Sequence, residues 1–545
     1  MNRKYIVLFI FSFSVFLPLK SQIIAPAEHE KKAGILLTWD YQESHNTVTA
    51  DLCKNLQPNG QVWIVYYPGQ VPYDTSYIKQ YLFQHGVSDY NFSFVPAWTE
   101  TFWIRDYGPF SVYNQGNEYH RMILDAGYSA YGRPKDDSVP AQLAGYWNIE
   151  HQDISLEFEG GNLLFDGLGR GVTSSRILSQ NPGLTENQVA DTLKKYFGLY
   201  DVQILEALEN CGGGIWAHVD MYIKFLDHEK ILVSQYPDTV PDYDIIENNA
   251  AQLDSLTNAF GNSYEIIRIP APVNDDGTYP VSQNEEMRTY TNSVTFNGCI
   301  VVPSYDQPFD SVAYQVYSRS MPGYDIRMVD ARNITPSYGS LHCITKEMVP
   351  PQLLRIIFNP VRGILEYSNE FTVNCRIQSS LDEPEVRIFC RKNQETIFQQ
   401  TEFQATDTGF VALLNQFEPQ DTIYYYLQAI AGNDTIHEPF TAEKKPYSFW
   451  FAEVPDTIDD KTPLPVGNQH QTTISPNPSD GEFYIMSDML KADVFLYNMK
   501  GNLYYSQLNQ KFPLHLDLKS CLHAGIYFIM MKNSDCYSVK KIIVY

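Results

Sequence analysis

The sequence predicts an α/β unit on its N-terminal side, followed by units made of β-strands. From about residue 23 to 348, short apolar runs rich in β-branched residues alternate with segments whose apolar residues recur at helical spacing. Strands that alternate with helices are typical of an α/β domain. The predicted strands include 34–39, 61–67 and 299–303, and the predicted helices include 185–197 and 244–260.

The pattern changes after Pro350 and Pro351, where predicted strands follow one another with only turns between them. Strands at 370–378, 385–391, 410–414 and 422–429 are typical of a small β-sandwich of immunoglobulin-like size. A stretch rich in Asp, Thr and Pro then indicates an extended linker, and short strands with Gly turns end the chain. We therefore predict an α/β unit at 22–352, an immunoglobulin-like domain at 353–453, a linker at 454–473 and a C-terminal β-sandwich at 474–545.

The N-terminus has the pattern of an export signal. Residues 2–4 are Asn-Arg-Lys, residues 5–19 are almost wholly apolar, and residues 20–22 offer a cleavage site. The apolar run is short for a membrane span. We predict a signal peptide at 1–21 and a secreted or cell-surface protein, with an uncleaved anchor as the alternative.

Charge and cysteine content exclude some functions. A formal net charge of −25 argues against nucleic-acid binding, which needs dense Lys and Arg, and is compatible with a cationic ligand. The eight cysteines are too sparse for a disulfide scaffold, and no C-x-x-C motif supports a structural zinc site. Pairing of Cys375 with Cys390, or of Cys521 with Cys536, stays open.

Cys343 is the first candidate for chemistry. It lies in a turn of small residues, in the sequence Gly-Ser-Leu-His-Cys-Ile-Thr at 339–345, far from any other cysteine. A thiol without a partner at metal-ligand spacing is a candidate nucleophile.

Three upstream residues suit a guanidinium ligand. Asp106 and Asp220 could grip the planar, forked cation through paired charge-assisted hydrogen bonds. His218 and Asp220 are two residues apart, which predicts that both side chains share one face of a strand. His218 would then offer a proton-transfer group to the same ligand.

Each of these motifs alone has an ordinary structural explanation. An Asp after an Arg is usually a surface ion pair, a His-x-Asp is more often a satisfied polar pair, and a lone Cys is usually inert and buried. Glu159-Gly160-Gly161 can be a turn, and Asn292 can be a hydrogen-bonding residue at a strand end. These explanations account poorly for the combination.

The combined motifs resemble one enzyme family. The matching segments are 103–110 (WIRDYGPF), 159–162 (EGGN) with 166–167 (DG), 216–220 (WAHVD), 290–293 (YTNS) and 341–345 (LHCIT). In residues and in order they are similar to the Porphyromonas-type peptidylarginine deiminase and agmatine deiminase family, over about 25–350. The resemblance implies the pentein fold, a five-bladed α/β propeller with its site on the axis.

The resemblance also implies catalytic roles. Cys343 would attack the guanidinium carbon held between Asp106 and Asp220, and His218 would protonate the departing ammonia. His218 would then activate the water that hydrolyses the thiouronium adduct to a urea-type product, while Asn292 orients the site. No organic cofactor and no metal is implied.

The substrate-binding positions match the family less closely. Secreted peptidylarginine deiminase clamps the carboxylate of a C-terminal arginine with two arginines, and here Tyr131 and Arg133 stand at those positions. Ile215 stands where that enzyme has a tyrosine. Trp103 would wall the aliphatic stem, and the Glu159 segment is closer to agmatine deiminases. These five residues are the predicted substrate contacts.

The final module resembles a type IX secretion sorting domain of Bacteroidetes. The similar segments are 475–478 (SPNP), 493–498 (DVFLYN) and 524–527 (AGIY). Such a domain implies passage through the periplasm and recognition by the type IX secretion machinery. It is typically removed before release or surface attachment. We expect a monomer.

We therefore predict a secreted deiminase that converts peptidyl arginine to citrulline and ammonia. The alternative within the family is agmatine, giving N-carbamoylputrescine, or free arginine. A metal-dependent hydrolase would instead use Asp106, His218 and Asp220 as ligands. A catalytically inactive surface adhesin is the alternative outside the enzymes.

Overall fold

The computed structural model describes residues 23–451 and 472–544, apart from short gaps. The gaps are 70–73, 117–118, 129–131, 211–217, 366, 382, 394, 420, 443, 476, 478, 480, 488, 499–502, 520–521, 523–524 and 534–536. The predicted signal peptide and most of the predicted linker lie outside the described residues. Within the described part of the chain, no helix is both long and apolar enough to cross a membrane.

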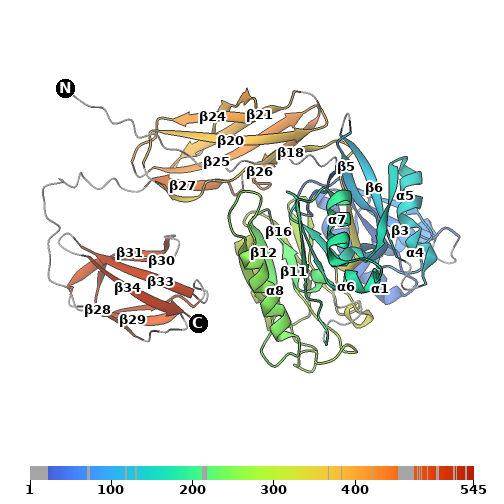
Figure 1. The fold of residues 1–545 in the computed structure, drawn as a ribbon, viewed down its shortest axis with the longest axis horizontal. Coiled ribbons are helices and arrows are strands. Elements are labelled where there is room, and N and C mark those ends of the chain that lie inside the picture. Colours follow the sequence, from blue (N-terminus) through green and yellow to red (C-terminus); the bar gives the residue numbers. More distant parts are fainter. Residues whose placement is uncertain are drawn as a thin grey trace.

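In the first unit, the described strands form five sheets (Figure 1). In spatial order they are β1 (Ile23–Ile24), β5 (Phe110–Asn114), β6 (His120–Gly127) and β7 (Glu150–Glu157); β10 (Asp201–Leu205), β9 (Arg170–Ser174) and β8 (Leu163–Phe165); β11 (Ile223–Phe225), β12 (Lys230–Gln235) and β13 (Glu265–Pro270); β14 (Val294–Phe296), β15 (Cys299–Ser304) and β16 (Asp325–Asp330); and β17 (Thr345–Met348), β2 (Gly34–Thr38), β3 (Gln61–Tyr66) and β4 (Phe92–Pro96).

All five sheets share one plan. A strand pairs antiparallel with a second strand, which pairs parallel with a third, as in β8–β9–β10 and β11–β12–β13. The same order recurs in β14–β15–β16, β5–β6–β7 and β17–β2–β3. A parallel pair needs a crossover, and a helix supplies it. Because β17 pairs with β2, the last strand of the first unit lies in the same sheet as the strand that precedes α1, the first helix.

The helices of the first unit confirm the predicted α/β class. They are α1 (Glu43–Leu56), α2 (Thr75–Gln84), α3 (Ile104–Tyr107), α4 (Pro134–Asp137), α5 (Val139–Trp147), α6 (Arg176–Gln180), α7 (Glu186–Phe197), α8 (Tyr243–Ser255) and α9 (Pro308–Ser320). Thr185 and Gln188 form a capping box before α7, and Gly198 ends it in the left-handed region. The prediction of a helix up to residue 260 was too long, because Leu256 is already extended.

The second unit consists of two sheets that share one apolar core. One sheet is β18 (Leu354–Ile357), β20 (Glu370–Ser379), β24 (Gly409–Asn415) and β23 (Gln404–Thr406). The other is β19 (Gly363–Leu365), β27 (Tyr447–Phe451), β25 (Thr422–Ala431), β21 (Glu385–Lys392) and β22 (Gln399–Glu402), with β26 (Asp434–Glu438) on β25. Cys375 and Cys390 are free thiols on different sheets.

The last unit also has two sheets around a common apolar core. They are β28 (Thr472–Ser475), β29 (Glu482–Ser487) and β32 (Leu514–Asp517), and β31 (Leu503–Lys511), β30 (Lys491–Asn498), β33 (Gly525–Lys532) and β34 (Tyr537–Val544). Cys521 and Cys536 lie outside the described residues.

Buried polar contacts join the first unit to the second, which lies beside it (Figure 1). Arg355 of β18 is buried, and its Nε is 3.2 Å from Glu30 Oε1. Its Nη2 donates to the backbone oxygen of Gly167 at 2.6 Å.

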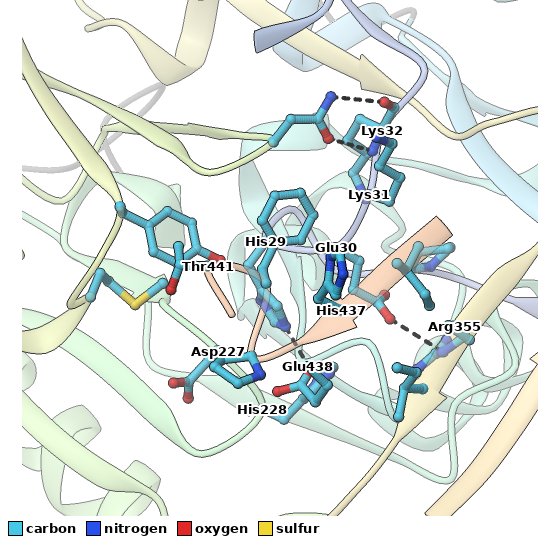
Figure 2. Close-up of a pocket in the computed structure, with 18 of the residues that line it drawn as sticks. His29, Glu30, Lys31, Lys32, Asp227, His228, Arg355, His437, Glu438 and Thr441 are labelled. Atoms are coloured by element: carbon cyan, nitrogen blue, oxygen red, sulfur yellow. Dashed lines mark hydrogen bonds and ion pairs between the residues drawn. The ribbon is translucent and has the colours of Figure 1, made fainter. Parts of the chain in front are cut away.

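A cavity of about 1080 Å³ lies at the same junction (Figure 2). Its lining includes His29, Asp227 and His228 from the first unit and Arg355 and Glu438 from the second. None of the predicted site residues lines it, so this cavity is separate from the predicted chemistry.

We expect Arg355→Met to lower the free energy of unfolding by about 3–5 kcal/mol, because it leaves the largely buried Glu30 carboxylate without its buried cation. Urea-induced unfolding would measure this. Arg387→Met is the control, since Arg387 pairs with Glu385 at the surface of β21 and should cost less than about 1 kcal/mol. Equal losses in the two variants would contradict the prediction.

Candidate active site

The predicted site residues lie on short turns or bends just before the first of the three strands in the plan that the sheets share. Asp106 is on α3, before β5, and Cys343 is on a 3-10 turn at His342–Ile344, before β17. Glu159 precedes the turn at Gly160–Asn162, and Asn292 lies in the bend before β14. The α3 turn contacts the turns that follow Glu159 and that carry Cys343, so the shared plan of the sheets gathers these residues.

His218 and Asp220 are not on a strand, which corrects the sequence prediction. Asp220 is on a 3-10 turn at Val219–Met221, and His218 is the extended residue that precedes it. Their side chains nevertheless face the same site, because the tight turn brings both toward Gly161. The side chains of His218 and Asp220 lie together as predicted, but a tight turn, and not alternation along a strand, is the cause.

Gly161 marks the point on which three functional groups converge. A Cβ atom there would lie 2.9 Å from His218 Nδ1, 3.0 Å from Asp106 Oδ1 and 3.1 Å from Asp220 Oδ2. The backbone N–H of Gly161 also donates to Asp106 Oδ1 at 3.3 Å. Any side chain at this position would enter the space between the carboxylates.

Cys343 is buried beside this point. Its Sγ is 3.9 Å from Asp220 Oδ2 and accepts from Asn292 Nδ2 at 3.3 Å. Asn292 Oδ1 accepts from the backbone N–H of His342 at 2.9 Å, which fixes the turn that carries the thiol. Burial, followed by the charges of Asp220 and Asp106, holds the pKa of Cys343 well above its ordinary value.

His218 lies between two carboxylates. Its Nδ1 is 3.5 Å from Asp106 Oδ1, and its Nε2 is 3.6 Å from Glu159 Oε2. Burial lowers the pKa of His218, but Asp106 and Glu159 outweigh it, so the pKa is raised. A protonated imidazole can act as a general acid.

Glu159 is anchored by Arg176, whose Nη2 donates to Oε1 at 2.7 Å. Burial would raise the pKa of Glu159, but His218 and Arg176 hold it well below its ordinary value. Glu159 therefore stays charged behind the imidazole.

Asp106 and Asp220 leave a place for a cation. Burial, together with the charges of Asp220 and Glu159, raises the pKa of Asp106 to about 6 despite the opposing effect of His218. Asp220 Oδ1 is buried and has no hydrogen-bond partner. Two carboxylates with an unused acceptor fit a planar, forked cation, which would offset their mutual repulsion.

Trp103 lies against the segment that carries the thiol. A Cβ atom at Gly339 would lie 2.3 Å from the Trp103 ring and 3.2 Å from Cys343 Cβ. Arg133 is half-buried, and its Nη1 is 3.4 Å from the hydroxyl of Tyr128. Tyr131 and Ile215 lie outside the described residues, so their predicted roles stay predictions.

Sequence reasoning missed several charged residues behind the site. Arg105 pairs with Glu347 at 2.7 Å, and its Nε donates to the backbone oxygen of His342 at 3.2 Å. The ammonium of Lys346 is buried over the Phe110 ring, and burial, reinforced by Arg105, lowers its pKa to about 7. Arg105 and His342 stood inside the matched motifs, so their positions could have been flagged.

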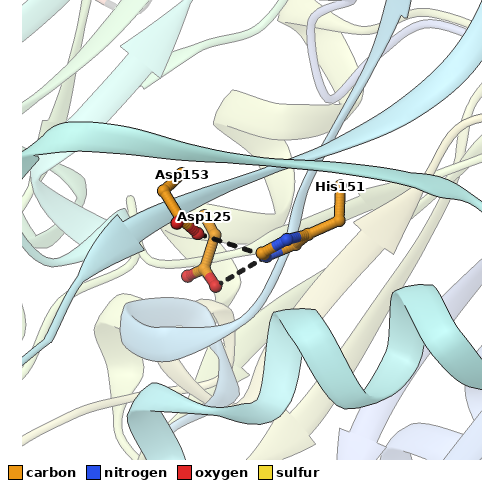
Figure 3. Close-up of side chains that lie close together, drawn as sticks. All are labelled: Asp125, His151 and Asp153. Atoms are coloured by element: carbon orange, nitrogen blue, oxygen red, sulfur yellow. Dashed lines mark hydrogen bonds and ion pairs between the residues drawn. The ribbon is translucent and has the colours of Figure 1, made fainter.

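One group of potential metal ligands shares no residue with this site (Figure 3). Asp125 on β6, with His151 and Asp153 on β7, is the only group of three His, Cys, Asp or Glu residues in the described part of the chain whose ligand atoms all lie within 4.8 Å of one another. Asp106, His218 and Asp220 do not form such a group, so their geometry does not favour the metal-dependent alternative.

Two family models match the chain. Residues 24–350 match the model of Porphyromonas-type peptidyl-arginine deiminase, and residues 473–545 match that of a secretion system C-terminal sorting domain. An agmatine deiminase of Medicago truncatula is 28% identical over 280 residues, which cover 45% of this chain and 75% of that protein.

Solved structures show the same fold for the first unit. The agmatine deiminase of Enterococcus faecalis gives a TM-score of 0.53 at 19% identity, over 61% of this chain and 97% of that one. An agmatine deiminase of C. jejuni gives 0.52 at 23% identity, over 61% and 97%. These structures support the α/β class and the arrangement of many small sheets.

We expect Asp220→Asn to speed alkylation of Cys343 by iodoacetamide at neutral pH, because it removes a negative charge that raises the thiol pKa. When the pH is below the thiol pKa, each unit by which that pKa falls should raise the alkylation rate about tenfold, because more thiolate is present. Mass spectrometry would follow the labelled peptide. Asp153→Asn, an exposed site, is the control; a rate in Asp220→Asn equal to that of the control would contradict the prediction.

Proposed function

Because the chain belongs to the Porphyromonas-type peptidyl-arginine deiminase family, whose members hydrolyse C–N bonds of guanidine groups, we propose that it converts arginine in peptides to citrulline and ammonia. One observation carries this proposal. Asp106, Asp220 and His218 converge on a single point, and the buried Cys343 thiol lies 3.9 Å from Asp220. A guanidinium at that point would meet two carboxylates, a proton donor and a nucleophile.

The first half-reaction would form the covalent adduct. The substrate cation neutralises the carboxylates that raise the Cys343 pKa, which favours the thiolate. The Cys343 thiol gives its proton to solvent, the resulting thiolate forms a bond to the guanidinium carbon, and His218 gives its proton to the departing nitrogen. The C–N bond breaks, ammonia leaves and an S-alkylthiouronium remains.

The second half-reaction would restore the enzyme. His218, now neutral, takes a proton from a water molecule whose oxygen attacks the thiouronium carbon. The C–S bond breaks, the thiolate leaves with its electron pair, and it takes the hydroxyl proton of the product, which restores the thiol. The product keeps the urea group, and His218 is again protonated, as its raised pKa favours.

We assign the surrounding residues as follows. Asn292 orients the turn that carries Cys343, and Trp103 packs against the aliphatic part of the substrate's side chain. The carboxylate oxygens of Glu159 contact Arg176 and His218. These contacts support a role for Glu159 in holding His218, and not the substrate contact that we expected from the sequence. Arg133, with Tyr131 and Ile215, would contact the rest of the substrate.

We also propose the domain organisation expected from the sequence. The five sheets with one plan, and the pairing of β17 with β2, support a five-bladed propeller at 22–352. The two-sheet unit supports an immunoglobulin-like domain at 353–453. The match to a secretion system sorting domain indicates export and supports a signal peptide at 1–21, type IX secretion and a sorting domain at 474–545.

The choice of substrate separates two candidates. The sorting domain favours peptides, which an exported enzyme meets outside the cell. The names of the relatives favour agmatine. Release of ammonia from a C-terminal-arginine peptide, an internal-arginine peptide, free arginine and agmatine would decide between them.

We expect Cys343→Ala to abolish ammonia release from every substrate, because no other described residue at the convergence point offers a thiol. Full activity in this variant would exclude the covalent mechanism. Substrate binding without ammonia release by the unchanged protein would instead support the adhesin alternative.

We expect Gly161→Ala to reduce kcat/KM at least about 100-fold, because its Cβ would occupy the convergence point. Gly145→Ala in α5 is the matched control, since its Cβ would meet nothing within 4 Å. Removing a helical glycine there should stabilise the fold by up to about 1 kcal/mol. Comparable kcat/KM values for the two variants would contradict the proposed position of the guanidinium.

A further inference from the structure

The proposed site meets solvent beside Trp103 and Arg133. Its catalytic side chains are all buried, each with no more than 7% of its surface exposed: Asp106, His218, Asp220, Asn292 and Cys343. Trp103 and Arg133 are only partly buried. Within the described part of the chain, the portion of a substrate beyond the guanidinium and its stem would therefore leave the site along these two side chains.

An exposed tryptophan lies on the segment that leads to Trp103. Trp98 is 56% exposed, although its neighbours Ala97 and Thr99 are buried. No hydrogen bond or ring contact holds its indole within the described residues. Its backbone is fixed, because its N–H donates to Gln142 Oε1 at 2.8 Å. The indole is therefore presented to solvent from a backbone that is held in place.

The same segment is held against α4, the helix that follows Arg133. In α4, Asp136 Oδ1 accepts from the backbone N–H groups of Glu100 at 2.6 Å and Thr101 at 3.2 Å. In return, the backbone N–H of Lys135 donates to Glu100 Oε2 at 3.0 Å. These contacts fix the two segments beside which the site meets solvent.

A second exposed aromatic residue adjoins Trp103 from another segment. Tyr338 is 39% exposed and directly precedes Gly339, where a Cβ atom would lie 2.3 Å from the Trp103 ring. The backbone of Tyr338 has φ 75° and ψ 46°, in the left-handed region that bulky residues rarely adopt. Backbone strain of this kind is concentrated at functional sites.

A single exposed aromatic residue is common on protein surfaces. Trp98 and Tyr338 differ from that case, because one has a fixed backbone, the other a strained one, and both segments adjoin Trp103. A fixed indole offers a large apolar surface, and little side-chain freedom is lost when a ligand covers it. Agmatine has nothing beyond its stem that could cover these rings, whereas a peptide has the side chain next to arginine.

We propose that Trp98, together with Tyr338, binds an apolar side chain of the residue that precedes arginine in a peptide substrate. The two rings determine which peptides are bound and do not contact the reacting atoms. This inference rests on the proposed function, and it makes the choice between peptides and agmatine depend on residues outside the catalytic set.

Ammonia release from peptides with Phe or Gly before arginine, and from agmatine, tests the proposal in the full chain. The arginine is placed at the C-terminus in one set of peptides and internally in another. We expect the unchanged protein to prefer the Phe peptides at least about tenfold in kcat/KM. Trp98→Ala should remove this preference by raising KM, and should leave kcat/KM for agmatine unchanged. Trp98→Phe should keep most of the preference, because it keeps an aromatic ring.

Tyr90→Ala is the matched control. Tyr90 is also an exposed aromatic residue, at 48%, but it precedes β4, whereas Trp98 follows that strand, so the two lie at its opposite ends. All rates should stay unchanged in this variant. A Phe preference that survives in Trp98→Ala would overturn the proposal. An equal loss of activity toward peptides and agmatine would also overturn it, because Trp98 would then act on the packing of the site.

Binding separates a failure of this proposal from a failure of the proposed function. Calorimetric titration of the Cys343→Ala protein with the Phe peptides needs no turnover, and adding Trp98→Ala should weaken binding at least about tenfold. Absence of ammonia release from every substrate would refute the proposed function, while the titration would still test Trp98. Turnover of agmatine, with neither turnover nor binding of any peptide, would overturn the proposal and leave the deiminase activity in place.

Discussion

The site depends on carboxylates that stay charged although they are buried. A buried charge is costly unless it is paired and hydrogen-bonded. Glu159 has Arg176, and Glu28 has Lys224. Among the described cationic side chains, the ion-pair partners of Asp106 and Asp220 are the histidines His218 and His342. A guanidinium would complete their pairing, because Asp220 Oδ1 is buried without a hydrogen-bond partner.

The fold brings these charges together by repeating one arrangement. Each sheet of the first unit is preceded by a short turn or bend, and each contributes a functional residue at the same structural position. The pairing of β17 with β2 brings the Cys343 turn back to the start of the unit. Rigid strands thus position the side chains, which suits a reaction that depends on geometry.

The elements and most of the site could be predicted from local patterns. The strand at 299–303 is a continuous apolar run, and α7 has both a capping box and a C-terminal glycine. Asp106, His218 and Cys343 stood in motifs with a clear chemical use. His218 and Asp220 were placed on a strand because their spacing suits both a strand and a tight turn. Only backbone hydrogen bonding distinguishes these.

The sequence alone determined the class of the first unit, the order of its motifs and the candidate nucleophile, because helical periodicity, apolar runs and residue chemistry are local properties. The tertiary structure decided which charges meet. Glu28 lies in no motif, yet it contacts His342 across more than three hundred residues of chain. Gly161 is one of two adjacent glycines, and only the packed turns show that its missing side chain is the space for a ligand. Contacts between distant segments depend on how the sheets pack, and no local pattern encodes that packing.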